Sequence, residues 1–125
     1  MNEKLKLSQL GHTWLFDLDG TVLKHNGYLT DGTDTLLDGA SDFLKSIPQK
    51  DSVVFITSRS SEYKQATEEF LKSNGIRYDA IIFDLPYGER ILINDIKPGG
   101  LRPGIAINSK RDEWVGISVE EDPCL

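Results

Sequence analysis

Residues 14–23 read WLFDLDGTVL, an apolar strand that ends in two closely spaced acids. The first three residues are all apolar, which is typical of a strand in a parallel sheet that helices cover. Asp17 and Asp19 then follow with one residue between them, so their carboxylates share a face of the strand, about 6–7 Å apart. Two negative charges at this spacing repel, and the pair is stable when a cation lies nearby or when one acid holds a proton.

Segments with strand and helix patterns alternate along the rest of the chain. Apolar and β-branched runs predict strands at residues 13–18, 53–56, 80–83 and 90–93, with a short fifth at 105–107. Apolar residues at helical spacing predict helices over residues 36–47 and 63–71. The alternation predicts an α/β fold, a three-layer Rossmann-like sandwich with a mostly parallel five-stranded sheet.

The length of the chain suits one compact unit. We expect its 125 residues to form a single domain, with a core at about residues 12–108 and a C-terminal tail at about residues 109–125. The end of this tail is acidic, and we expect it to fray.

Composition narrows the class of partner and the compartment. A total of 14 Lys and Arg residues against 20 Asp and Glu residues gives a formal net charge of −6, which argues against a nucleic-acid binder with a basic face. Cys124 is the only cysteine, which favours a reducing compartment. No apolar run approaches the roughly 20 residues of a membrane span, and no signal-peptide pattern opens the chain. We therefore expect a cytoplasmic protein that binds neither membrane nor nucleic acid.

Several polar side chains follow the predicted strands and should meet at one edge of the sheet. They are Asp17 and Asp19 after the first strand, Thr57 and Arg59 after the second, and Asp95 after the fourth. Parallel sheets bind ligands beyond the carboxyl ends of their strands. The acid pair suits phosphoryl transfer, in which one acid attacks phosphorus and the other protonates the leaving oxygen and later activates water. An all-oxygen site of this kind suits Mg²⁺.

The segment from Asp17 to Thr21, DLDGT, resembles the first motif of the haloacid dehalogenase (HAD) superfamily of phosphohydrolases. Thr57 is similar to the hydroxyl of the second motif, which binds phosphoryl oxygens, and Asn94-Asp95 is similar to the metal-binding fourth motif. The resemblance implies that Asp17 is the nucleophile and a Mg²⁺ ligand. It further implies that Asp19 is the general acid/base and also a metal ligand, and that Asp95 helps to hold the ion.

Residues beside these motifs are the expected substrate contacts: Gly20, Thr21, Ser58 and Arg59. Gly20 lets the backbone turn away without placing a Cβ in the pocket. Arg59 is placed to grip a second anionic group of the substrate.

The chain departs from the family's third motif, a lysine or arginine that neutralises the nucleophile and the phosphate. Related small phosphatases carry Gly-Lys-Pro where this sequence has Asp84-Leu85-Pro86. We expect Lys97 to replace that lysine as a catalytic residue, because it closely follows the predicted metal-binding strand end. The other candidates are Arg59, Lys64, Lys72 and Arg90.

The short spacing between the motifs resembles that of capless members, whose open site a second subunit of a homo-oligomer would cover. The resemblance implies Mg²⁺-dependent hydrolysis of a small phosphorylated metabolite, such as a sugar phosphate, through an aspartyl-phosphate intermediate. One alternative is a relative that binds phosphate or a sugar nucleotide with little or no turnover. Another is a receiver-like signalling domain with Asp84 as phospho-acceptor, but a receiver's threonine follows its acceptor, whereas Thr57 precedes Asp84.

Overall fold

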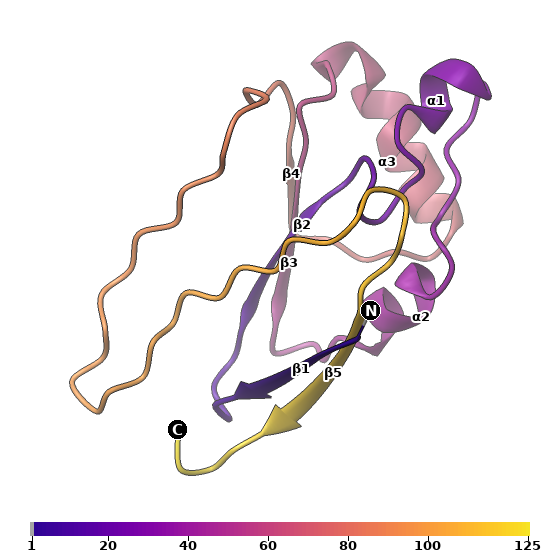
Figure 1. Cartoon of the computed structure of the whole chain (residues 1–125). Helices are drawn as coiled ribbons and strands as arrows, with labels where there is room; N and C mark the ends of the chain where they lie inside the picture. The colour runs from indigo at the N-terminus through magenta and orange to yellow at the C-terminus, as the bar shows by residue number, and fades with distance from the viewer. Residues whose placement is uncertain (1) are drawn as a thin grey trace.

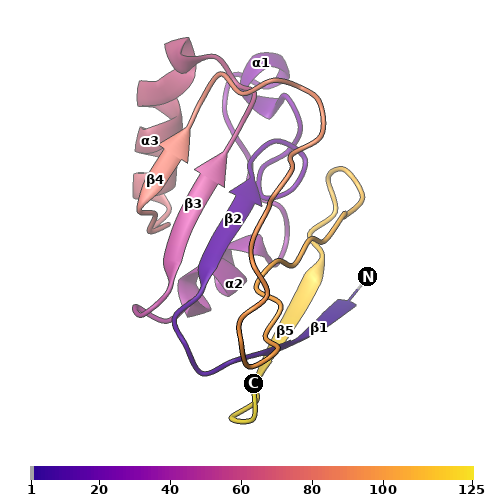
Figure 2. The same ribbon diagram turned by 90° about the vertical axis from the view of Figure 1, so that its left-hand side faces the viewer.

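The main sheet of the protein has three parallel strands that bring the acid pair beside the end of the next strand. The computed structural model describes residues 2–125. Strands β2 (Thr13–Asp17), β3 (Ser52–Ile56) and β4 (Ala80–Ile82) are hydrogen-bonded in the order β2-β3-β4 (Figure 2). In this register Asp17 lies opposite Ile56, so the residues that follow β2 and β3 emerge side by side.

The helices lie on one face of this sheet. Figure 1 shows α1 (Gly27–Thr30), α2 (Ala40–Ser46) and α3 (Lys64–Ser73) on the same side, and a short 3₁₀ turn, η1 (Ser61–Tyr63), leads into α3. Phe16 of β2 and Val53 and Phe55 of β3 face the helices and are buried together with Leu44 of α2 and Leu71 of α3. Alternate residues of a strand point to opposite faces, so the other face carries partly exposed apolar side chains.

A second sheet joins the two ends of the chain. Strands β1 (Asn2–Leu7) and β5 (Gly116–Glu121) pair in parallel along their whole length. Trp114, just before β5, packs against Phe16 and Phe43 of the core at ring-centroid distances of 6.2 and 5.5 Å. The prediction that the acidic end of the tail frays is therefore wrong for residues 116–121, which gain a strand partner at the other end of the sequence.

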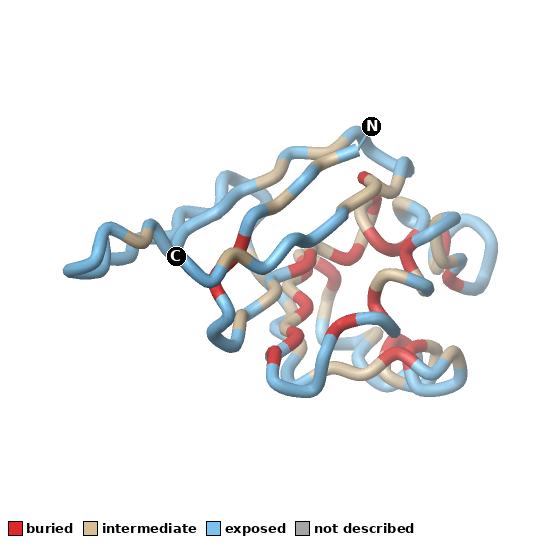
Figure 3. Tube along the Cα trace, turned by 90° about the horizontal axis from the view of Figure 1, so that it is seen from below, coloured by how far each residue is buried: buried red, intermediate tan, exposed pale blue. Residues whose placement is uncertain are grey.

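The residues between β4 and β5 differ most from the prediction. We call residues 86–111 the arm; it leaves near β3, where Leu85 N–H donates to Thr57 O at 3.1 Å, and returns where Asp112 N–H donates to Gly20 O at 2.8 Å. Figures 1 and 2 show it extending from the face of the sheet that has no helices, and most of it is exposed (Figure 3). Its far turn joins Lys97 to Leu101.

The α/β class with parallel strands is confirmed, but the single five-stranded sheet of a three-layer sandwich is wrong. The predicted strands at 90–93 and 105–107 have no regular secondary structure, and the five strands divide into sheets of three and two. Ile91 and Ile93 of the arm are 83% and 87% exposed. β-Propensity measures how well a side chain fits a pleated, half-buried surface, and this isoleucine-rich run has no such surface around it. None of the helices formed by residues 2–125 is long and apolar enough to cross a membrane.

Candidate active site

Asp17 is the last residue of β2, and its carboxylate contacts a cation and a hydroxyl group. Arg90 Nη1 donates to Asp17 Oδ1 at 2.8 Å, and Thr21 Oγ1 donates to Asp17 Oδ2 at 3.1 Å. About a third of each side chain of the Asp17–Arg90 pair is exposed, at 33% and 37%. Asp17 is thus oriented by two donors and is still open to solvent.

Asp19 lies two residues after Asp17 and is hydrogen-bonded to residues that follow β3. Thr57 Oγ1 donates to Asp19 Oδ2 at 3.2 Å, and Arg59 Nη2 donates to Asp19 Oδ1 at 2.6 Å. Thr57 is buried, and its hydroxyl oxygen also accepts the Arg59 backbone N–H at 3.0 Å. The structure therefore brings together Asp17, Asp19, Thr57 and Arg59, as their positions after neighbouring parallel strands predict.

A tight turn after β2 keeps the backbone clear of the acids. The carbonyl of Leu18 accepts N–H groups from the next turn of chain, including that of Leu23 at 2.9 Å. Gly20 has φ of +86°, and a Cβ there would lie 3.1 Å from Arg111 Cγ at the returning end of the arm. The left-handed conformation favours glycine here, and any larger residue would also push against the Arg111 side chain.

Arg59 does not face solvent as a substrate-gripping residue would. Its guanidinium binds Asp34 through two hydrogen bonds of 2.9 and 3.0 Å, and its side chain is only 1% exposed. Burial acts to lower the pKa of Arg59, but the hydrogen bonds to Asp34 and Asp19 outweigh it and raise that pKa above its ordinary value. Arg59 is therefore a fixed cation that links the acid pair to the segment before α2.

The structure does not bring Lys97 or Asp95 to the acid pair. Lys97 Nζ lies 3.7 Å from Asp95 Oδ1 within the arm, and the two side chains are 52% and 79% exposed. The far turn of the arm lies away from the carboxyl ends of β2 and β3 in both views (Figures 1 and 2). Arg90, one of the other candidates, is the cation that contacts Asp17.

The remaining predicted contacts divide between the two ends of the arm. Gly20 and Thr21 lie beside Asp17, as described above. Ser58 Oγ instead donates to Pro86 O at 3.2 Å and fixes the start of the arm. Asp84, the acceptor of the receiver alternative, has φ of +61° and accepts the Ser61 N–H at 3.0 Å, as a turn residue does.

No set of three or more His, Cys, Asp or Glu side chains placed to hold a metal ion occurs within residues 2–125. Asp17 and Asp19 still offer two carboxylates at the end of one strand. Mg²⁺ binds through one or two carboxylates, with waters and substrate phosphate completing its shell. Asp17 and Asp19 are therefore the residues that would hold this ion, whereas the expected third ligand, Asp95, does not join them.

Sequence reasoning missed Asp34, which is buried against Arg59. It lies in the polar run DGTDT, residues 31–35, where nothing separates a buried acid from a loop acid. A buried carboxylate requires a partner, and that partner, Arg59, is contributed by a distant part of the chain.

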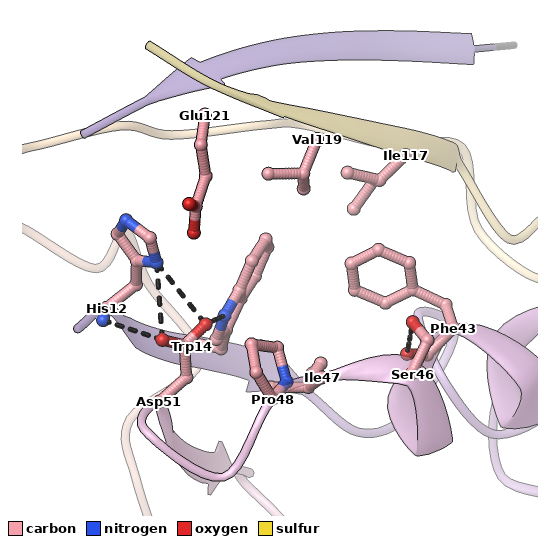
Figure 4. Close-up of a pocket in the computed structure, with 10 residues that line it drawn as sticks. All are labelled: His12, Trp14, Phe43, Ser46, Ile47, Pro48, Asp51, Ile117, Val119 and Glu121. Atoms are coloured by element: carbon pink, nitrogen blue, oxygen red, sulfur yellow. Dashed lines mark hydrogen bonds and ion pairs between the residues drawn. The ribbon is translucent and has the colours of Figure 1, made fainter. Parts of the chain in front are cut away.

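A cavity of about 280 Å³ lies at the opposite end of the main sheet, between α2 and β5 (Figure 4). It is lined by the residues before β2 and β3, among them His12 and Asp51, and by Glu121. Asp51 is buried and accepts hydrogen bonds from the His12 backbone N–H and from Trp14 Nε1, both at 3.0 Å. The Asp51 carboxylate therefore links the start of β3 to the start of β2 through these hydrogen bonds. Neither Asp17 nor Asp19 lines this cavity.

Comparison with known proteins gives two structural matches. Neither a family model nor a curated protein matches the chain. A solved structure of the Pnkp1/Rnl/Hen1 complex is 28% identical with a TM-score of 0.52, over 66% of this chain and 31% of that chain. A structure of the Pnkp1/Rnl/Hen1 RNA repair complex is also 28% identical with a TM-score of 0.52, over 68% of this chain and 29% of that chain. The protein thus spans about a third of the length of the chains that it matches.

Proposed function

We propose that the protein is a Mg²⁺-dependent phosphomonoester hydrolase of the HAD-like type that works through an aspartyl phosphate on Asp17. The observation that carries the proposal is the surroundings of Asp17, a partly exposed carboxylate at the end of a parallel strand with Arg90 Nη1 2.8 Å from its Oδ1. A nucleophilic carboxylate that must meet an anionic phosphate needs a positive charge beside it.

The proposed reaction assigns one step to each side chain. An oxygen of Asp17 attacks phosphorus, a P–O bond forms, and the bond to the leaving oxygen breaks as Asp19 donates a proton to that oxygen. Asp19 then takes a proton from water, which attacks phosphorus and releases phosphate and the free Asp17 carboxylate. Arg90 offsets the charge that builds up on the phosphoryl group, and Thr57 holds Asp19 through its 3.2 Å hydrogen bond.

Asp17, with Asp19, would hold Mg²⁺. Bound there, the ion would supply positive charge to the phosphoryl oxygens. Arg90 and Arg59 each contact one oxygen of these carboxylates, so two cations already offset the repulsion within the pair.

The substrate proposed is a small phosphorylated metabolite in the cytoplasm, such as a sugar phosphate. The net charge of −6 favours a small ligand over a long nucleic acid. Because one structural match is an RNA repair complex, an oligonucleotide with a terminal phosphate belongs in the same substrate screen. The open site leaves room for a second copy of the chain to cover it.

A second candidate function is phosphate binding with little or no turnover. It is favoured by the position of Lys97 and Asp95, which pair with each other in the exposed arm and so do not contribute to the site around Asp17. Under that hypothesis, Asp17 and Arg90 would form a binding site without a competent metal site.

Hydrolysis of an aryl phosphate with and without Mg²⁺ tests the proposal and separates the two candidates. We expect turnover that needs Mg²⁺, stops with EDTA and is lost in Asp17→Asn. Asp38→Asn, an exposed acid outside the site, is the matched control and should keep full activity. Activity that survives Asp17→Asn, or no activity on any of a panel of phosphomonoesters, would overturn the proposal.

A further inference from the structure

We propose that Asp34 is a positioning residue for Asp19, which it holds through the buried guanidinium of Arg59. The inference rests on the proposed function, because it gives Asp34 a part in the work of the acid/base carboxylate. The two acids bind the same nitrogen of one cation. Arg59 Nη2 donates both to Asp19 Oδ1 at 2.6 Å and to Asp34 Oδ1 at 3.0 Å.

The guanidinium has no freedom to turn toward a substrate. Nη1 donates to Asp34 Oδ2 at 2.9 Å and to Thr67 Oγ1 at 2.9 Å. Arginine carries two N–H groups on each terminal nitrogen, so these bonds and the two from Nη2 use all four. Nε is buried and has no partner within residues 2–125.

Neighbouring groups fix the plane of the guanidinium as well. The ring of Tyr28 in α1 lies 3.8 Å from Arg59 Cζ, a cation–π contact. Thr67 Oγ1 donates in turn to Tyr63 O at 2.7 Å, which sets the direction of its own lone pairs. Arg59 is therefore held by Tyr28 of α1, by Thr67 of α3 and by Asp34, and its remaining terminal N–H binds Asp19 of the acid pair.

Loss of Asp34 would release the two-bond fork that orients Arg59. Asp34 is buried, and both of its carboxylate oxygens accept hydrogen bonds from this guanidinium. Bidentate pairs of this kind fix the geometry of the two groups as well as pairing their charges. Without the fork, Nη2 would no longer hold Asp19 Oδ1 in one place. A misplacement of about 1 Å in a reacting group can cost about 10²-fold in rate, so the effect should appear in kcat rather than in binding.

The test compares Asp34→Asn with Asp31→Asn, a control in the same loop whose carboxylate pairs with Lys24 at the surface. With an aryl phosphate, Asp34→Asn should lower kcat about tenfold or more and leave KM within about threefold. Asp31→Asn should match the wild type. Arg59→Lys keeps the charge but loses the fork, so it should show the same loss in kcat. Equal kcat in all four proteins would overturn the inference while leaving the proposed function standing.

A thermal-unfolding cycle tests the same link without any activity. Melting shifts of Asp19→Asn and Asp34→Asn should fail to add in the double variant, by about 2 °C or more, although the two side chains share only Arg59. The shifts of Asp19→Asn and Asp31→Asn should add. Additive shifts for Asp19 and Asp34 would overturn the inference, whereas an inactive wild-type protein with coupled shifts would overturn only the proposed function.

Discussion

Replacing Arg90 with alanine should separate catalysis from stability more cleanly than any other change. Two unit charges about 4 Å apart attract by about 1 kcal/mol in water and by about 4 kcal/mol at an effective dielectric constant of 20. About a third of each side chain is exposed, at 37% for Arg90 and 33% for Asp17, so the pair should contribute only about 0–1 kcal/mol to folding. In the transition state, however, the loss of one preorganised electrostatic donor typically costs about 10²-fold or more, which is about 2.7 kcal/mol.

The assay is steady-state hydrolysis of an aryl phosphate beside urea unfolding of the same preparation. Arg90→Ala should lower kcat/KM by about 10²-fold and leave the free energy of unfolding within about 1 kcal/mol of the wild type. Arg90→Lys should recover part of the rate, since it restores the charge without the planar fork. Lys97→Ala is the control, because Lys97 pairs with Asp95 in the arm. A large loss in Lys97→Ala with an unchanged Arg90→Ala would refute the reasoning and return the role to the lysine.

Three further predictions concern stability and are measured by urea unfolding. Burial acts to raise the pKa of Asp51, but the hydrogen bonds that it accepts hold that pKa below the ordinary value of 3.8. Its stabilising effect should therefore be present above about pH 4 and fade as the pH falls through the lowered pKa, and Asp51→Asn should flatten this acid dependence. Gly20→Ala should lower the free energy of unfolding by about 1–2 kcal/mol because of its left-handed backbone, and by a further amount because of the contact with Arg111. Gly32 also has a left-handed backbone, with φ of +76°, but nothing lies within 4 Å of its added Cβ, so Gly32→Ala should show the backbone effect alone. Equal losses in the two variants would contradict the close approach. Ile93→Ser should change the free energy of unfolding by no more than about 0.5 kcal/mol, as for other exposed positions, and a loss of several kcal/mol would indicate that the residue is buried in a strand.

The predicted strands succeeded where an apolar run meets a neighbouring strand and failed where it does not. Strands β2, β3 and β4 agree with the predicted segments to within a few residues, because β2 and β3 bury one face against the helices and Ile81 of β4 packs against the same core. Residues 90–93 have the same isoleucine-rich pattern but lie exposed in the arm. Strand β5 was missed because its sequence gives a weak strand signal although a partner strand is present. Its sequence GISVEE is weakly apolar, and its partner β1 lies at the other end of the chain.

The candidate site shows the same division between local and distant signals. The positions of Asp17, Asp19 and Thr57 followed from strand ends that lie next to each other in a parallel sheet. The cation beside Asp17 could not be chosen in this way, because Arg90 and Lys97 belong to one irregular segment whose path depends on contacts at both of its ends. Spacing along the sequence favoured Lys97, but the path of the arm brings Arg90 to Asp17 instead.

The central claim is that Asp17 itself becomes phosphorylated, and chemical trapping tests this directly. The protein is mixed with substrate and Mg²⁺, quenched within the first turnover and treated with borohydride, which reduces an acyl phosphate to an alcohol. We expect peptide mass spectrometry to find homoserine in place of aspartate at position 17, and an unmodified peptide when substrate is omitted. Reduction at Asp19, Asp84 or Asp95 instead, or turnover with no reduced aspartate at any position, would contradict the claim.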